Sequence, residues 1–256
     1  MRLYRGKNDG LPIKIILKMQ RVQYFLYLCT VKLIAKMKIY NLSETNSIVN
    51  QYLAEMRDVD VQGDRAKFRN NMVRIGHAMA YEVSKRLVYS TKNVQTPLGV
   101  APVSTPDNDI VIGTIFRAGL PFHQGFLEVF DKADSAFVSA YRYYTDKECE
   151  KVGIKTEYIA SPQLDGKTLI LADPMLATGG SMELGYETFC TKGIPAEVHL
   201  CCIIASKKGV DYVKRMFHKN PYVTLWCATI DPMLNEHAYI VPGLGDAGDL
   251  AYGEKI

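Results

Sequence analysis

The C-terminal two thirds of the chain alternates between short apolar runs and stretches with a helical pattern. The apolar runs predict five buried strands, at residues 110–116, 136–141, 168–172, 197–205 and 223–229. Helices are predicted near residues 120–131, 181–192 and 208–219. Strands that alternate with helices in this way are typical of an α/β fold with a mainly parallel sheet covered by helices.

Two helices are predicted before residue 110. Ile48, Tyr52, Leu53 and Met56 suit a short amphipathic helix, and a polar turn through Gly63 follows it. Asp64 is a candidate N-cap for a second helix. In that helix apolar residues recur at three- and four-residue steps, at Phe68, Met72, Ile75, Met79, Val83 and Leu87. Such a stripe predicts a face that packs on the core.

Residues 146–162 are polar and contain Gly153. We interpret them as an excursion from the sheet, in the form of a hairpin arm long enough to act as a lid.

Residues 1–36 differ from the rest of the chain because basic residues repeatedly interrupt their apolar sequence. Their longest uncharged run, residues 22–31, is far shorter than the roughly 20 residues that a membrane-spanning helix needs. A secretory signal would require a small-residue cleavage site, and none is convincing here. We interpret residues 1–36 as an extension outside the functional protein, and residues 37–256 as one domain. A helix lying in a membrane interface is a less favoured alternative.

Charge and cysteine content indicate which partners and which cellular compartment to expect. The net charge of +4 conceals an asymmetry: residues 1–36 carry +7, so the remainder carries −3. The body of the chain therefore lacks the basic character of a nucleic-acid-binding protein, and we expect neither a nucleic-acid nor a membrane partner. The six cysteines show no metal-ligand spacing, and Cys201 and Cys202 lie in an apolar run. Core thiols in a reducing cytoplasm are the simplest interpretation.

Three stretches that follow predicted strands carry candidate chemistry. Asp173 ends the strand at residues 168–172, where open α/β sheets bind their ligands. The small residues at 177–181 (Ala-Thr-Gly-Gly-Ser) then allow a tight turn into the next helix, an arrangement that binds phosphate. Arg117 follows the strand at 110–116 and offers a guanidinium fork to a diphosphate.

The third stretch is the most specific: Asn235-Glu236-His237-Ala238-Tyr239-Ile240-Val241-Pro242-Gly243-Leu244-Gly245-Asp246-Ala247-Gly248-Asp249. Its proline and glycines predict an irregular backbone with exposed N–H and C=O groups. Such a loop can read the acceptor–donor–acceptor edge of uracil and reject cytosine, which would leave buried polar groups unpaired. We give no catalytic role to His237 or Asp231, and we take Arg57 and Arg69 as exposed helix charges.

The string Asp173-Pro174-Met175-Leu176-Ala177-Thr178-Gly179-Gly180-Ser181 resembles the phosphoribosyl-diphosphate (PRPP) loop of type I phosphoribosyltransferases. Pro174 stands where most of that superfamily has a second acid, a departure shared with its uracil-specific members. The stretch at 235–249 and the triplet Arg117-Ala118-Gly119 also resemble that family, as does Tyr141-Arg142. The resemblance covers about residue 37 to the C-terminus.

The resemblance implies a role for each matching residue. Residues 173–181 (Asp173, Pro174, Met175, Leu176, Ala177, Thr178, Gly179, Gly180 and Ser181) would bind the ribose hydroxyls and the 5′-phosphate of PRPP. Arg117 and Arg142 would hold the diphosphate. Ile240, Gly245, Asp246 and Ala247 would contact uracil, with Asp246 also reaching PRPP directly or through a metal. Arg142 and Asp246 are the candidate catalytic residues, Asp246 for the N1 proton of uracil.

The expected fold is therefore that of a type I phosphoribosyltransferase, with a helical N-terminal elaboration and a C-terminal base-binding loop. The expected reaction converts uracil and PRPP to UMP and diphosphate, with Mg²⁺ bound mainly by PRPP and water. A homodimer or higher homo-oligomer is expected. Two alternatives remain open: transfer to another base, and a PRPP-sensing regulator that binds RNA. For this reaction the segment near Asp173 and the loop near Gly245 must face one another across a shared cleft.

Overall fold

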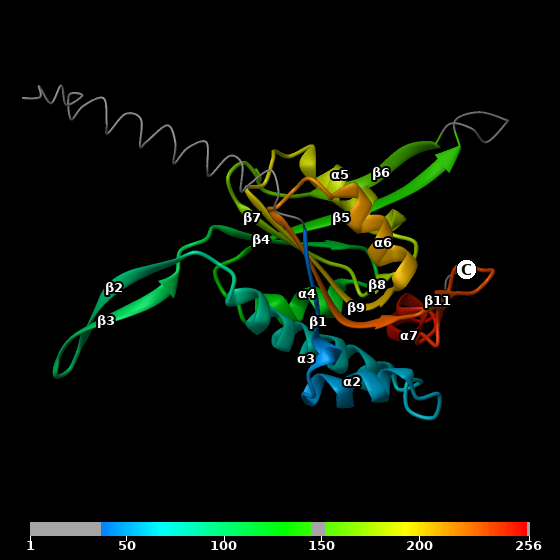
Figure 1. Ribbon diagram of the computed structural model, residues 1–256, viewed down its shortest axis with the longest axis horizontal. Coiled ribbons are helices and arrows are strands. Elements are labelled where there is room, and N and C mark those ends of the chain that lie inside the picture. Colours follow the sequence, from blue (N-terminus) through cyan, green and yellow to red (C-terminus); the bar gives the residue numbers. More distant parts are fainter. Residues whose placement is uncertain (1–36, 145–151, 255–256) are drawn as a thin grey trace, which may run out of the picture.

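The computed structural model describes residues 37–144 and 152–254, and for residues 140–144 and 152–156 it describes the backbone alone. In this part of the chain one central sheet of eight strands dominates (Figure 1). The strands are β1 (Lys38–Asn41), β4 (Ile110–Ile115), β5 (Asp134–Tyr144), β6 (Val152–Ala160), β7 (Thr168–Ala172), β8 (Met175–Leu176), β9 (Glu197–Ser206) and β10 (Val223–Asp231).

The strand order of the sheet is β1-β10-β9-β7-β4-β5-β6, and the short β8 also pairs with β9. Every pairing is parallel except that of β6, which runs antiparallel to β5 at one edge. The predicted mainly parallel sheet is thus confirmed. Strand β7 is buried at all five positions, as its uninterrupted apolar run indicates.

Helices cover both faces of the sheet (Figure 1). On one face lie α2 (Ile48–Arg57), α3 (Arg65–Ser84), α4 (Leu120–Leu127) and the C-terminal α7 (Ala247–Tyr252). On the other lie α5 (Gly180–Cys190) and α6 (Lys207–Met216). Each layer has its own core, with Phe68 and Phe122 buried in the first and Phe189 in the second. The predicted stripe of α3 is buried throughout, and Asp64 caps that helix by accepting a hydrogen bond from the Lys67 N–H.

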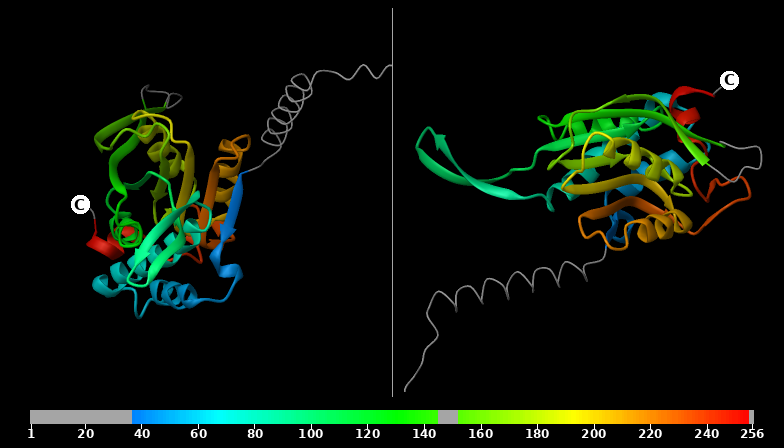
Figure 2. Two further views of the ribbon diagram at one scale, coloured as in Figure 1. Left: turned by 90° about the vertical axis from the view of Figure 1, so that its left-hand side faces the viewer. Right: turned by 90° about the horizontal axis from the view of Figure 1, so that it is seen from above.

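Two regions before residue 110 contain elements that were not predicted from the sequence. Strand β1 forms an edge of the sheet, and a 3₁₀ turn, η1 (Leu42–Glu44), follows it. Strands β2 (Tyr89–Thr96) and β3 (Gly99–Pro106) form an antiparallel hairpin, the β2–β3 arm, which projects from the body of the molecule (Figures 1 and 2). Because most of its residues are exposed, the arm lacks the alternation of buried and exposed positions that marks a strand in sequence.

The predicted excursion at 146–162 is partly described. Strand β6 returns antiparallel to β5, which fits a hairpin, but residues 145–151 lie outside the described part of the chain. Residues 1–36 lie outside it too. Within the described residues, no helix is both long and apolar enough to cross a membrane. Cys201 and Cys202 are fully buried, as predicted.

Candidate active site

A cavity of about 360 Å³ opens where β4 and β7 end, between these strand ends and the C-terminal loop. The residues that line it are Ile115, Phe116, Arg117, Ala118, Asp173, Pro174, Met175, Ala177, Ser181, His237, Ala238, Tyr239, Gly245, Asp246 and Gly248. Asp173 and Gly245 therefore share one cavity, as the interpretation of the sequence requires. Its position agrees with the general rule that open α/β sheets bind ligands beyond the carboxyl ends of their strands.

Asp173 is placed by the strand that precedes it. Its backbone N–H donates to the carbonyl of Cys201 (3.0 Å), which extends the pairing of β7 with β9. The side chain is only 8% exposed, and this burial raises its pKa to about 7, although the Met175 N–H acts in the opposite direction. Among the described residues no cation pairs with this buried carboxyl group, which is poised to accept hydrogen bonds from ligand hydroxyls.

The loop after Asp173 is held tightly against helix α6. Ser206 donates from its hydroxyl to the carbonyl of Ala177 (2.5 Å) and accepts from the N–H of Gly209 (2.8 Å). A Cβ atom at Gly209 would lie 2.6 Å from the same carbonyl, so only glycine permits this approach. The fixed loop then leads directly into α5.

Helix α5 begins with its backbone N–H groups facing the loop. Gly179 is its N-cap with φ of +95° and provides no side-chain cap, and the Gly180 N–H makes a long hydrogen bond to Thr178 Oγ1 (3.4 Å). A Cβ atom at Gly179 would lie 2.4 Å from the Tyr212 ring, so glycine is required for space as well as for conformation. Uncapped N–H groups at a helix N-terminus bind phosphate.

Arg117 follows β4 as predicted, but the structure gives its guanidinium partners that the sequence did not suggest. Its Nη2 donates to Asp249 Oδ1 (2.8 Å) and to the carbonyl of Gly253 (2.7 Å), both on the C-terminal segment. Its Nε is buried and has no hydrogen-bond partner among the described residues. Gly119 allows this turn to approach β4, since a Cβ atom there would lie 2.0 Å from Thr114 Oγ1.

The opposite wall of the cavity is the stretch from Asn235 to Gly248. Strands β11 (Met233–Leu234) and β12 (Ile240–Val241) pair antiparallel below a tip formed by residues 235–239. The tip is organised by Asn235, whose Oδ1 accepts from the N–H groups of His237 (3.0 Å) and Tyr239 (2.9 Å). Beyond β12, Asp246 caps α7 by accepting from the Asp249 N–H (2.9 Å).

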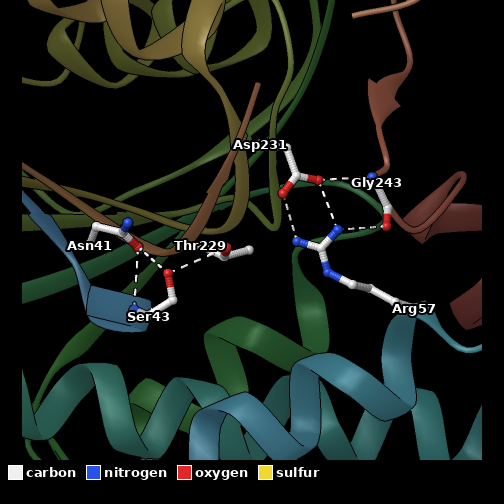
Figure 3. Close-up of polar contacts among 6 residues, drawn as sticks. All are labelled: Asn41, Ser43, Arg57, Thr229, Asp231 and Gly243. Carbon is white, nitrogen blue, oxygen red and sulfur yellow. Dashed lines mark hydrogen bonds and ion pairs between the residues drawn. The ribbon is translucent and has the colours of Figure 1, made fainter. Parts of the chain in front are cut away.

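The base of this stretch is fastened to helix α2. The Arg57 guanidinium makes two bonds to the Asp231 carboxylate (2.7 and 2.8 Å), and Gly243 binds both partners (Figure 3). Burial alone would raise the pKa of Asp231, but the Arg57 guanidinium and the Gly243 N–H together lower it. Arg57 and Arg69 were taken as exposed charges, which is wrong. Both side chains are half-buried, and Arg69 donates to the carbonyl of Ala251 (2.7 Å).

A second contact near α2, between η1 and β10, appears in the same view. Ser43 donates from its hydroxyl to Asn41 Oδ1 (2.8 Å) and lies 3.5 Å from Thr229 Oγ1 (Figure 3). The end of β10 is thus approached by the N-terminal segment at two places.

The predicted site residues divide into three groups. The cavity is lined by Arg117, Asp173, Pro174, Met175, Ala177, Ser181, Gly245 and Asp246. The second group lies in the same stretches of sequence but does not line the cavity: Leu176, Thr178, Gly179, Gly180, Ile240 and Ala247. Ile240 and Ala247 are buried, at 3% and 1% exposure. The Arg142 side chain lies outside the described residues, and its backbone pairs with Ile154 in the hairpin of β5 and β6.

Other residues line the cavity without having been predicted to do so, among them Phe116, Ala118, His237, Tyr239 and Gly248. Most of these residues lie inside the stretches singled out from the sequence. Their position next to the predicted site residues was therefore the only sequence feature that could have identified them. Phe116 is 40% exposed and stacks on Phe137 and Tyr158. Nothing in the sequence distinguishes it from the buried residues of the preceding strand.

The ionisable groups of the site suit a metal ion that is bound by both protein and substrate better than one that is coordinated by protein side chains alone. Among the described residues no group of three or more His, Cys, Asp or Glu side chains could hold a metal ion. Two carboxylates, those of Asp173 and Asp246, line the cavity. Mg²⁺ that is bound by one or two carboxylates and by substrate phosphates matches this donor set.

Comparisons with a family model and with known proteins agree on one family. Residues 43–254 match the family model described as UPRTase, uracil phosphoribosyltransferase. The chain is 52% identical to the uracil phosphoribosyltransferase of Porphyromonas gingivalis over 220 residues, which is 86% of this chain and all of that protein. It is 40% identical to the enzyme of that name from Methanothermobacter thermautotrophicus, over 81% of this chain and 93% of the relative.

A solved structure is also similar. The AQ2163 protein from Aquifex aeolicus superposes with a TM-score of 0.72 at 28% sequence identity, over 85% of this chain and 99% of that one.

Proposed function

The chain belongs to the uracil phosphoribosyltransferase family, and from this premise we propose that it catalyses uracil + PRPP → UMP + diphosphate, a step of pyrimidine salvage. The bond from C1′ to the diphosphate oxygen breaks, the bond from C1′ to uracil N1 forms, and the N1 proton leaves. The observation that carries this proposal is the single cavity shared by Asp173 and the Gly245–Asp246 loop. One wall suits a sugar phosphate and the other a flat base.

The sugar phosphate of PRPP binds at residues 173–181. Asp173 accepts hydrogen bonds from the ribose hydroxyls, and the N–H groups at the start of α5 bind the 5′-phosphate, with the Thr178 and Ser181 hydroxyls beside them. The geometry that supports this assignment is the buried carboxyl followed by a fixed loop and an uncapped helix N-terminus.

The diphosphate binds to Arg117 and Arg142. The buried Nε of Arg117, which has no partner among the described residues, supports an anion at this position. Negative charge builds on the diphosphate as the C1′–O bond breaks, so cations fixed there stabilise the transition state more than the substrate.

Uracil binds against residues 237–248, where main-chain groups read its imide edge. The exposed tip and the Gly245–Asp246 segment line the cavity and supply these groups, while Ile240 and Ala247 support them from beneath. Asp246 is the proposed acceptor of the N1 proton. Its Oδ1 already accepts from the Asp249 N–H, which leaves Oδ2 for this proton or for the contact with Mg²⁺.

Mg²⁺ belongs to the proposal as a cofactor bound chiefly by PRPP oxygens and water, with Asp246 as the protein ligand. When bound, it offsets the negative charge of the diphosphate. The residues of the chain meanwhile orient C1′ against N1, which supplies much of the rate in such a transfer.

A homo-oligomer is also part of the proposal. The β2–β3 arm exposes Tyr89, Val94, Leu98, Val100 and Val103 to solvent, with Leu98 fully exposed. An isolated two-stranded hairpin is marginally stable in water, so a second copy of the chain that covers the arm would account for it. Light scattering should give a molar mass of at least two chains.

A cytoplasmic location and a functional protein of residues 37–256 complete the proposal. Free thiols at Cys190, Cys201, Cys202 and Cys227 support a reducing compartment. The P. gingivalis relative aligns over 220 residues, which equals the span of residues 37–256.

The test is product formation from PRPP and labelled uracil, orotate or hypoxanthine, each supplied alone with Mg²⁺. We expect UMP from uracil and no nucleotide from the other two bases. Product from another base in place of uracil would overturn the base assignment. Tight, salt-dependent binding of a pyrimidine-operon leader RNA, with no UMP formed, would favour the regulator.

A further inference from the structure

A ring of hydrogen bonds closes the base of the loop that forms the second cavity wall. Arg57 Nη2 donates to Asp231 Oδ1 (2.7 Å), and Arg57 Nη1 donates to Asp231 Oδ2 (2.8 Å) and to the carbonyl of Gly243 (3.0 Å). The Gly243 N–H donates to Asp231 Oδ2 (2.8 Å). Figure 3 shows these three residues joined to one another. We call this set the loop clamp.

The loop clamp uses both polar backbone groups of Gly243, and its N–H, which can make only one good hydrogen bond, is not available to a ligand. Gly243 has φ of +65°, and a Cβ atom there would lie 1.9 Å from the carbonyl oxygen of Ile240. The backbone is therefore locked in a conformation that other residues rarely adopt. The contacts fix the position of the chain rather than bind substrate.

The clamp joins the two ends of the excursion that includes the tip. Asp231 ends β10, the chain then forms β11, the tip and β12, and Gly243 returns to Asp231 12 positions later. Two residues beyond Gly243 the chain reaches Gly245 and Asp246, which line the cavity. Every cavity-lining residue of this wall thus lies either between the clamped ends or just after them.

Arg57 connects helix α2, which is distant in sequence, to the base of the C-terminal loop. It is the last residue of α2, 174 positions before Asp231, and helix α2 packs on α3 in the first core. The Asp231 side chain is 6% exposed and that of Arg57 25%. A bidentate pair with this degree of burial has a fixed orientation, which a flexible lysine would not reproduce.

We infer that Arg57 and Asp231 are positioning residues for base recognition: they hold Gly243 so that the flanking main-chain groups fit uracil. Neither residue lines the cavity. The inference rests on the proposed function, since it concerns the base-binding half of that site. A loop that reads a base through its main chain depends on backbone placement to a fraction of an ångström.

The test measures steady-state kinetics of the unmutated full chain and of its Arg57→Ala and Arg57→Lys variants, with the uracil and PRPP concentrations varied separately. For Arg57→Ala we expect kcat/KM for uracil to fall roughly ten- to hundredfold, and KM for PRPP to stay within about twofold. Arg57→Lys keeps the charge but loses the fork, and should recover only part of the loss. Asp231→Asn should resemble Arg57→Ala, and the double variant should lose little more than either alone.

A matched control breaks another contact of the same helix. Glu55 on α2 accepts from Asn71 Nδ2 (2.9 Å) and lies 3.5 Å from Lys67 Nζ, away from the loop. Glu55→Gln should change neither KM. Free guanidinium ion at sub-denaturing concentration should restore uracil use to Arg57→Ala, which a general loss of stability would not allow.

Hydrogen exchange provides a readout independent of turnover. The Gly243 N–H donates to a buried carboxylate and should exchange slowly in the native protein, and residues 240–247 should lose protection in Arg57→Ala. Equal changes in both KM values, or an unchanged KM for uracil with a deprotected loop, would overturn the inference. A native protein that forms no UMP would instead contradict the proposed function, and exchange would still report on the clamp.

Discussion

The two walls of the cavity are built in different ways. The sugar-phosphate wall is one continuous segment, in which strand β7, Asp173, the loop at 177–181 and helix α5 follow one another. The base wall is irregular, and its geometry depends on Arg57, which lies 174 positions before its partner Asp231. The residues of the first wall follow one another in sequence, although Ser206 and Gly209 also hold its loop. The second wall depends on a contact between the N-terminal helices and the C-terminal loop. Changes at the two walls should therefore affect different substrates.

The largest effect is expected for Asp173→Asn at the sugar-phosphate wall. An amide has a similar shape but lacks the charge that strengthens hydrogen bonds from the ribose hydroxyls. Turnover should fall on the order of a hundredfold or more, with uracil binding little changed. Steady-state rates and uracil titration measure the two effects, and full activity in this variant would remove Asp173 from the mechanism.

A pair of glycine substitutions tests the separation of the walls directly. Gly179→Ala should raise KM for PRPP and Gly243→Ala should raise KM for uracil, each by roughly tenfold, because both positions have positive φ and no space for a Cβ atom. Gly63→Ala is the control, since it has open space and no positive φ. KM for PRPP and KM for uracil are measured in all three variants. If each glycine variant raised the two constants equally, the walls would not be independent.

Asp173 should also make stability depend on pH. Its folded pKa of about 7 lies above the ordinary 3.8, so the folded protein binds the extra proton between these values. The native protein should therefore lose stability relative to Asp173→Asn as pH rises from 4 through 7, by up to roughly 4 kcal/mol. Urea unfolding of both proteins at pH 5 and pH 8 gives the difference. A difference that does not change with pH would show that Asp173 is not buried in its neutral form.

The smallest effect is expected on removing residues 1–36. The described residues that line the cavity lie between 115 and 248, and the family match begins at residue 43. The rate and both KM values should stay within about twofold of the full chain. An inactive truncated protein that remains folded would show that the extension takes part in function.

The sugar-phosphate wall could be predicted from the sequence because its signals are local. An apolar run, an acid and a glycine-rich turn before a helix lie within one short stretch, and strand β7 matches its predicted bounds. The base wall was recognised as irregular, and Gly245 and Asp246 reach the cavity as predicted.

Contacts between distant segments could not be predicted in this way. Arg57 looks like any charge on a helix, and no periodicity marks its pairing with Asp231. The Asp249 partner of Arg117 was missed for the same reason. Most residues of the β2–β3 arm are exposed, so its sequence lacks the alternation of apolar and polar residues by which strands are recognised. The arm was therefore missed as well.

A crystal structure with bound UMP would show whether the two walls hold one nucleotide, because UMP joins a phosphate to a base within one molecule. We expect its 5′-phosphate at the N–H groups of residues 177–181, its ribose hydroxyls at Asp173 and its pyrimidine edge against the main chain of residues 237–248. UMP bound with its base away from that loop, or with its phosphate away from the start of α5, would contradict this arrangement.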